Sequence, residues 1–109
     1  MTRLTTDFWV LAYIARLTAA GIFVHVAHKG DPTAGAVAVK LATMDRNASL
    51  FLRRYNDDFE LVWNRELSTA PEFEVDEAIA KQRGYDRDLW VIEVEDPKGR
   101  HLLDEEGLS

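Results

Sequence analysis

The sequence predicts a single α+β domain, an antiparallel β-meander of four to five strands with one helix before it and a second helix before the last strand. Three observations support this class. Apolar residues keep a helical spacing up to Gly21 and alternate from Ile22 onward. The alternating segments are joined by short polar turns, which favour antiparallel neighbours. A helical spacing then returns over residues 69–84, and one more alternating segment follows it.

The composition is that of one folded domain covering residues 1–109, with 47% hydrophobic and 29% charged residues. No cysteine is present, which excludes disulfides, thiolate metal sites and cysteine nucleophiles and favours a cytoplasmic location. The net charge of −6 argues against nucleic acid as the partner. That charge is uneven, since residues 1–54 carry a net charge of +4 and residues 55–109 a net charge of −10. Such an asymmetry is typical either of an unevenly charged surface or of a molecule that orients a partner or its own copy.

The first helix is predicted over residues 6–20. Thr5 or Thr6 can cap its start, and Gly21 can end it. Its buried stripe is predicted as Val10, Ile14 and Leu17, widened by Phe8, Leu11 and Tyr13, with Trp9 and Arg16 half exposed beside it. The longest apolar run, residues 8–15, is too short to cross a bilayer, so no membrane contact is expected.

The strands are predicted at residues 22–27, 36–44, 49–55, 59–67 and 89–95. The Gly30–Gly35 loop joins the first two strands, since Pro32 and the two glycines suit a tight turn. A capping-box spacing between Thr69 and Glu72 predicts the start of the second helix, which Gly84 ends. The tail that holds His101 and Leu108 forms either a last short strand or a helical turn.

Both helices are expected on one face of the sheet, which leaves the other face open. The face beneath the helices is predicted to carry Val24, Val26, Val37, Val39, Leu41, Leu50, Leu52, Leu61, Trp63, Trp90, Ile92 and Val94. The open face is then predicted to carry Phe23, His25, Ala27, Ala36, Ala38, Lys40, Phe51, Arg53 and Tyr55.

The open face mixes apolar, aromatic and basic residues, and such a face is typical of a contact surface. Three interpretations stand: the tail or a loop covers it, a second copy buries it, or it binds a ligand or nucleic acid. Aromatic rings could stack on bases while basic side chains hold phosphates. The candidate binding residues are Phe23, His25, Lys40, Phe51, Arg53 and Tyr55, with Lys29, Asp31 and Thr33 of the loop as further candidates.

No catalytic residue, cofactor or metal site is predicted. His25 and His28 are three apart on a strand and should point to opposite faces, so a zinc site with Asp31 is not expected. Glu93 and Glu95 share one face of a strand and suit either an acid–base pair or a solvated strand edge. The Gly30–Gly35 loop lacks the Gly-Lys-Ser/Thr ending of a phosphate loop and precedes a strand rather than a helix.

Three segments resemble a known family. They are residues 8–22 (Phe8-Trp9-Val10 through Arg16-Leu17 to Gly21-Ile22), residues 29–37 and residues 86–96, with Gly99-Arg100-His101 after them. On these segments the chain resembles the small alphaproteobacterial family of unknown function DUF1491, while residues 45–70 match it less well. The typical Asp-Pro-Asp-Leu-Trp of that family has Arg87 in place of the proline. The resemblance implies a bacterial cytosolic single-domain protein and carries over no catalytic residue.

The expected function is therefore a non-enzymatic interaction or accessory protein, most simply a homodimer that self-associates through the open face. The alternatives are nucleic-acid or small-ligand binding on that face and, behind both, an enzyme.

Overall fold

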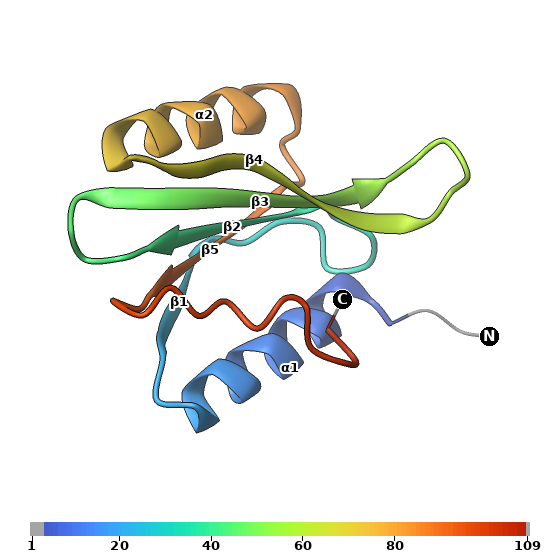
Figure 1. The fold of residues 1–109 in the computed structure, drawn as a ribbon. Coiled ribbons are helices and arrows are strands. Elements are labelled where there is room, and N and C mark those ends of the chain that lie inside the picture. The colour runs from blue at the N-terminus through green and yellow to red at the C-terminus, as the bar shows by residue number, and fades with distance from the viewer. Residues whose placement is uncertain (1–3, 109) are drawn as a thin grey trace.

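The computed structural model describes residues 4–108, which form a five-stranded sheet between two helices (Figure 1). The elements in chain order are α1 (Thr6–Ala19), β1 (Phe23–His28), β2 (Val37–Ala42), β3 (Asn47–Tyr55), β4 (Leu61–Pro71), α2 (Glu72–Tyr85) and β5 (Trp90–Glu95). The predicted α+β class, the N-terminal helix and the helix before the last strand are confirmed. None of the helices among these residues has both the length and the hydropathy needed to cross a membrane.

The strands are ordered β1-β5-β2-β3-β4, and β2, β3 and β4 form the predicted antiparallel meander. The last strand, β5, enters the sheet between β1 and β2, antiparallel to β1 and parallel to β2. The sheet is therefore mixed and not purely antiparallel. Nearly every residue of β2 and β5 is buried, as expected for central strands that are covered on both faces.

The two helices cover opposite faces of the sheet, so the prediction that they share one face is wrong (Figure 1). The core on the α1 side joins Trp9, Tyr13 and Leu17 of the helix to alternate residues of β2 and β5. The core on the α2 side joins Val75 and Ile79 to the residues in between. No open face is left over the centre of the sheet, because each face has its own helix.

The register of β3 explains why each predicted face of the sheet contains residues that lie on opposite sides in the structure. Val39 lies directly opposite Phe51, so these two side chains share the α1 side. Leu50 and Leu52 point to the α2 side with Ala38, although they were assigned to the same face as Val39. Both faces of this strand are apolar because both are buried, and hydrophobicity alone therefore could not set its phase.

The buried side of α1 also differs from the prediction. Trp9 is buried, while Phe8 and Leu11 are 58% and 66% exposed. The Trp9 ring stacks on Tyr13 with 4.9 Å between centroids, and its Nε1 donates to the carbonyl oxygen of Leu108. Burial of a large aromatic side chain whose N–H has a partner outweighs burial of Phe8 or Leu11 on this face.

At the ends of the two helices one prediction is confirmed and two are wrong, since α2 runs to Tyr85 and Gly84 lies within it. Gly21 has φ of 76° and ends α1, and the Ile22 amide donates to the Leu17 carbonyl as in a Schellman motif. The predicted capping box at the start of α2 is absent, since β4 runs to Pro71 and Thr69 lies within that strand. The first amide of α2, that of Glu72, donates instead to the carbonyl oxygen of Arg46.

The C-terminal tail forms turns and lies over the α1 side of the molecule (Figure 1). Leu103 and Leu108 enter the core there, and the Tyr13 hydroxyl donates to the carbonyl oxygen of His101. The His101 ring lies 4.7 Å from the Phe51 ring, centroid to centroid. Of the three interpretations of the predicted open face, coverage by the tail therefore holds at Phe51.

Candidate interaction surface

The six predicted binding residues do not share one face, which corrects the premise of the predicted site. Phe51 and Arg53 lie on the α1 side and are only 6% and 7% exposed. The Arg53 guanidinium stands over the Trp9 ring, 4.5 Å from its centroid. Lys40 lies on the other side of the sheet, buried beneath α2. A base could not stack on Phe51, nor a phosphate reach Arg53, without displacing this packing.

The other three candidates are exposed, but they do not form one surface either. Phe23 and His25 of β1 lie on the α2 side, since their partners on β5 are Glu95 and Glu93. Tyr55, at the end of β3, falls by alternation on the α1 side with Arg53. The structure thus brings together Phe23, His25 and Lys40 and separates them from Phe51, Arg53 and Tyr55.

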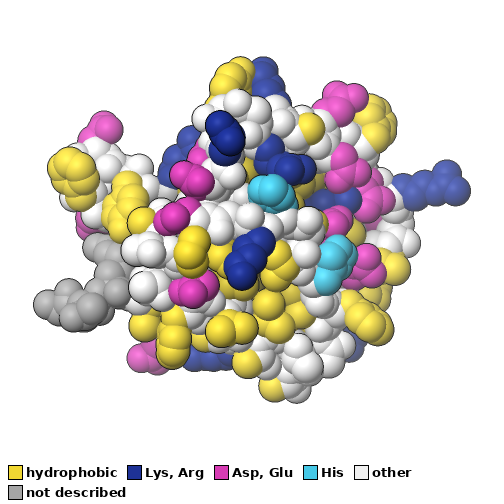
Figure 2. Space-filling model, turned by 180° about the vertical axis from the view of Figure 1, so that it is seen from behind, with side chains coloured by type: hydrophobic (Ala, Val, Ile, Leu, Met, Phe, Trp, Pro, Cys, Tyr) yellow, Lys and Arg dark blue, Asp and Glu magenta, His cyan; other side chains and the backbone are white. Residues whose placement is uncertain are grey.

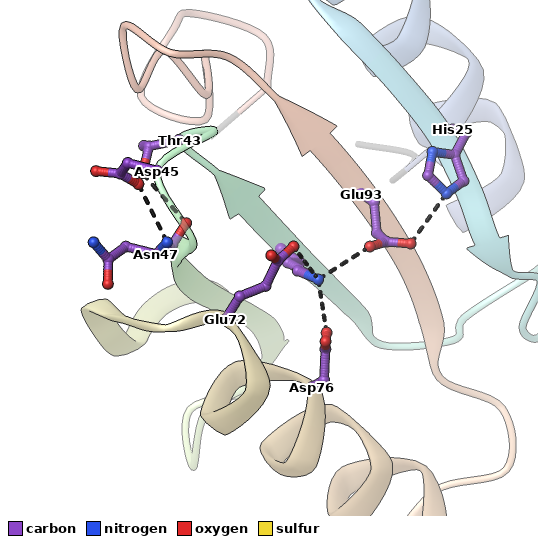
Figure 3. Close-up of polar contacts among 8 residues, drawn as sticks. His25, Thr43, Asp45, Asn47, Glu72, Asp76 and Glu93 are labelled. Atoms are coloured by element: carbon purple, nitrogen blue, oxygen red, sulfur yellow. Dashed lines mark hydrogen bonds and ion pairs between the residues drawn. The ribbon is translucent and has the colours of Figure 1, made fainter.

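Lys40 is the buried centre of an ionic cluster that links α2 to the sheet (Figure 3). Its Nζ lies 2.9 Å from Oε1 of Glu72, 2.7 Å from Oδ1 of Asp76 and 3.3 Å from Oε1 of Glu93. Oε2 of Glu93 in turn lies 3.0 Å from Nε2 of His25. All three donors of the ammonium are therefore directed at carboxylates of this cluster.

The ionisation of Lys40 follows from these contacts. Burial alone would lower the pKa of Lys40, but hydrogen bonds to Asp76 and Glu72 and the charges of Asp76 and Glu93 raise it above its ordinary value. Nucleophilic or basic lysines need a lowered pKa. The arrangement fits a charged group that holds α2 on the sheet and gives no support to an enzyme.

The two histidines of β1 lie on the same side of the sheet, whereas strand alternation predicts opposite sides. A bulge between Val26 and His28 adds a residue, so His28 lies opposite Val91, on the same side as His25. Their partners differ, because His25 contacts Glu93 whereas Nδ1 of His28 lies 3.1 Å from the Arg83 guanidinium. Among residues 4–108, no three His, Cys, Asp or Glu side chains lie in a group that could hold a metal ion.

The Gly30–Gly35 loop makes hydrogen bonds to the start of α1 and within itself. Its carbonyl oxygens at Thr33 and Pro32 accept the first amides of α1, from Thr6 and Asp7, at 3.1 and 2.9 Å. These amides have no partner within the helix, so the loop caps it. Oδ2 of Asp31 accepts the amides of Thr33 and Ala34. Of the three loop candidates, Asp31 and Thr33 hold the loop together, and Lys29 is exposed.

Close packing explains the two glycines of this loop. A Cβ atom at Gly30 would collide with the carbonyl oxygen of Asp88, and one at Gly35 would lie 2.6 Å from the same oxygen. The amide of Asp31 donates to that oxygen as well. The loop is therefore pressed against the turn before β5, and larger residues would push the two segments apart.

Large apolar side chains are exposed in a line on the solvent side of α1. Leu4, which precedes the helix, and Phe8 and Leu11 are 52%, 58% and 66% exposed. Ala15 and Thr18 continue the same line and are exposed too. We call these five residues the α1 stripe. Their spacing of four, three, four and three residues is that of a helix face which packs on another helix.

A groove runs beside this stripe, between α1 and β1. It has a volume of about 310 Å³ and is lined by Asp7, Val10, Leu11, Ile14, Val26, Lys29 and Trp90. Figure 2 shows hydrophobic side chains gathered in a band across the lower part of the face seen from behind, with histidine, acidic and basic side chains around its upper border. The sequence does not predict this surface, because the spacing of apolar residues assigns Leu11 and Val26 to the core.

The comparisons with known proteins decide the family. The family model described as a protein of unknown function, DUF1491, matches residues 4–104. The chain belongs to the DUF1491 family. Among curated proteins, none matches the chain.

Solved DUF1491 structures have the same fold. The crystal structure of a DUF1491 family protein from Caulobacter crescentus CB15 is 39% identical, with a TM-score of 0.83 over 94% of this chain and 97% of that one. An NMR structure of a DUF1491 family protein from the same organism is 40% identical, with a TM-score of 0.84 over 96% of each chain. The solution structure of a protein from A. tumefaciens is 29% identical, with a TM-score of 0.75 over 86% of each chain.

In this DUF1491 chain, two of the segments that carry the sequence resemblance, 29–37 and 86–96, lie against each other. The Trp90 amide donates to the carbonyl oxygen of Ala36 at 2.9 Å, and its Nε1 donates to that of Asp31 at 2.7 Å. The same loop caps α1, which belongs to the third segment. The resemblance therefore rests on residues that join α1, the loop and β5. The contacts among these residues hold the three segments together.

Proposed function

We propose that this DUF1491 protein is a non-enzymatic interaction protein that self-associates through the outer face of α1. The observation that carries the proposal is the α1 stripe, an exposed, uncharged and mainly apolar line from Leu4 to Thr18. Contiguous apolar surface on the outside of a folded domain is typical of a site that another protein covers.

The order of residue sizes along the stripe favours a second copy as the partner. Large side chains occupy its N-terminal part, at Leu4, Phe8 and Leu11, whereas Ala15 and Thr18 occupy its C-terminal part. In a two-fold symmetric pair of antiparallel helices, residue i of one copy contacts residue j of the other, and j contacts i. With Leu11 near the symmetry axis, Phe8 lies against Ala15 and Leu4 against Thr18. Phe8 and Leu4 then each meet a small side chain, while Leu11 meets its own copy at the axis, which suits close packing.

Nucleic-acid binding is not proposed, although the sequence suggested it as the alternative. That function needs aromatic and basic side chains exposed on one face. Phe51 and Arg53 are buried beneath α1 and the tail, and Lys40 is held by carboxylates on the opposite face.

The test is the solution mass of the wild type and of Leu11→Glu, measured by size-exclusion chromatography with light scattering. We expect a dimer of the 12.4 kDa wild-type chain. Leu11→Glu should be a monomer, because a carboxylate at the axis would be buried against its own copy.

Phe73→Glu is the matched control, since Phe73 is 63% exposed but lies on α2. This variant should stay dimeric. A monomeric wild type at a chain concentration of about 100 μM, or a Leu11→Glu variant that remains a dimer, would contradict the proposal, because a Kd well below that value is expected of a stable pair.

The cytoplasmic location predicted from the absence of cysteine and the predicted lack of a cofactor stay predictions.

A further inference from the structure

β1 is an edge strand without the usual protection against a further strand. Its outer side pairs with no strand among residues 4–108, and Phe23–His28 contains no Lys, Arg, Asp, Glu or Pro. The opposite edge strand, β4, carries Arg65, Glu66 and Pro71, which are typical devices against strand addition. Only the bulge between Val26 and His28 interrupts the free edge of β1. The stretch before the bulge can accept main-chain hydrogen bonds from an added strand.

The α1 side of this edge offers a place for apolar side chains. The groove of about 310 Å³ opens beside Val26, which is 37% exposed. Its walls are Val10, Leu11 and Ile14 of α1, and Trp90 lines it as well. Alternate side chains of a strand laid along β1 would point toward this groove.

The α2 side of the same edge offers a place for cationic side chains. The Phe23 ring is 79% exposed and lies next to Glu95, its register partner on β5. Glu95 is exposed, and Glu93 follows on the same side. An Arg or Lys that crosses the face of Phe23 could reach the Glu95 carboxylate, which combines a cation–π contact with an ion pair.

We propose that β1 binds an extended segment of another protein in which apolar residues alternate with Arg or Lys. The segment adds as a sixth strand, its apolar residues enter the groove, and its basic residues lie over Phe23 toward Glu95. On the α2 side of this edge, Glu93 and Glu95 supply the negative charge that complements the basic residues of such a segment. This site goes beyond self-association, because it uses the free edge of the sheet and Val10 and Ile14 of α1, and it shares only Leu11 with the α1 stripe.

The test uses a short fluorescent peptide in which Arg and Val alternate, with a Glu-Val peptide of the same length as control. We expect the Arg-Val peptide to bind saturably and to shift the NMR signals of the Val24 and Val26 amides. Glu95→Lys should weaken this binding about tenfold and strengthen that of the Glu-Val peptide. Glu95 is exposed, so this variant should fold like the wild type.

Three outcomes would overturn the proposal. The Arg-Val peptide could bind Glu95→Lys as tightly as the wild type, which would make the attraction non-specific. The shifted amides could lie away from β1. A second copy could already occupy the edge, in which case Leu11→Glu would stay dimeric and its β1 amides would be protected from exchange without peptide. The first two results leave self-association through α1 untouched, so the two proposals fail separately.

Discussion

At the scale of single residues, Lys40 shows how a buried charge is accommodated. The side chain is 5% exposed and contacts carboxylates from α2 and β5. Glu72 and Asp76 keep 43% and 58% of their side-chain surface exposed, so they remain hydrated on their outer sides while they neutralise the ammonium. A chain of contacts from His25 through Glu93 to Lys40 and Asp76 thus connects β1, β5, β2 and α2.

Lys40→Met tests this role, because methionine keeps an unbranched side chain but removes the charge. We expect the free energy of unfolding at pH 8 to fall by about 2–3 kcal/mol, since three carboxylates would face one another without a cation. Urea unfolding followed by tryptophan fluorescence measures this difference.

The stabilisation by the Lys40 charge should depend on pH in a defined direction. The pKa of Lys40 is raised in the folded protein, so its stabilising contribution is complete below the ordinary value of 10.5 and is lost as the pH rises above it. The difference between wild type and Lys40→Met should therefore narrow from pH 8 to about pH 11.5. Burial also raises the pKa of Tyr13, but that group is common to both proteins and cancels. A difference that stays constant over this range would show that Lys40 acts through packing alone.

At the scale of elements, the Gly30–Gly35 loop joins three parts of the chain. It caps α1, its glycines pack on the turn before β5, and Trp90 donates to Asp31. The contacts at the two glycines are made mainly by backbone atoms of Asp88, Leu89 and Asp31, which cannot move aside as a flexible side chain could.

Gly30→Ala should therefore lower the free energy of unfolding by about 2–3 kcal/mol, because the added methyl group meets the backbone of Asp88 and Leu89. Gly84→Ala is the matched control. A Cβ atom there meets nothing within 4 Å, and alanine in α2 should stabilise the protein by up to about 1 kcal/mol. Equal effects of the two substitutions in thermal unfolding would contradict the packing explanation.

The elements also show what the sequence could and could not predict. The helices and strands could be predicted from the spacing of apolar residues. The end of α1 could be predicted from Gly21, because glycine readily adopts the left-handed conformation that ends a helix. The sequence did not predict which residues of β3 face α1 and which face α2, nor which side of α1 is buried. Both faces of β3 are apolar, and Trp9, Phe8 and Leu11 compete for the core with similar hydrophobicity. The choice depends on tertiary partners such as Leu108, which lie far away in the sequence.

The predicted grouping of the six binding residues on one face was wrong for the same reason. Assigning Phe51 and Arg53 to an open face required both helices to lie on one side of the sheet. The place of β5 between β1 and β2, and of one helix on each face, is a property of topology that local patterns do not contain. The exposed residues Phe23 and His25 were found because alternation along β1 is clear.

At the scale of the whole molecule, the fold leaves two neighbouring surfaces for partners. The α1 stripe faces away from the sheet, and the edge of β1 faces along it. Self-association through the stripe keeps that edge free, so a dimer would present two copies of it. Leu11 belongs to both surfaces. Phe8 and Ala15 belong to the α1 stripe and do not line the groove, so substitutions there test self-association without altering the groove beside β1.

The measurement that tests self-association most directly is the solution mass of a size swap along the α1 stripe. Phe8→Ala removes a large side chain, and Ala15→Phe adds one opposite Phe8 of the partner. We expect each single substitution to weaken the dimer at least about tenfold, through lost burial or overpacking. The double variant Phe8→Ala/Ala15→Phe should recover the dimer, because the phenylalanine at position 15 then meets the alanine at position 8 of the partner. A double variant as monomeric as the single variants, or a wild type that is itself a monomer, would contradict an antiparallel pair of α1 helices.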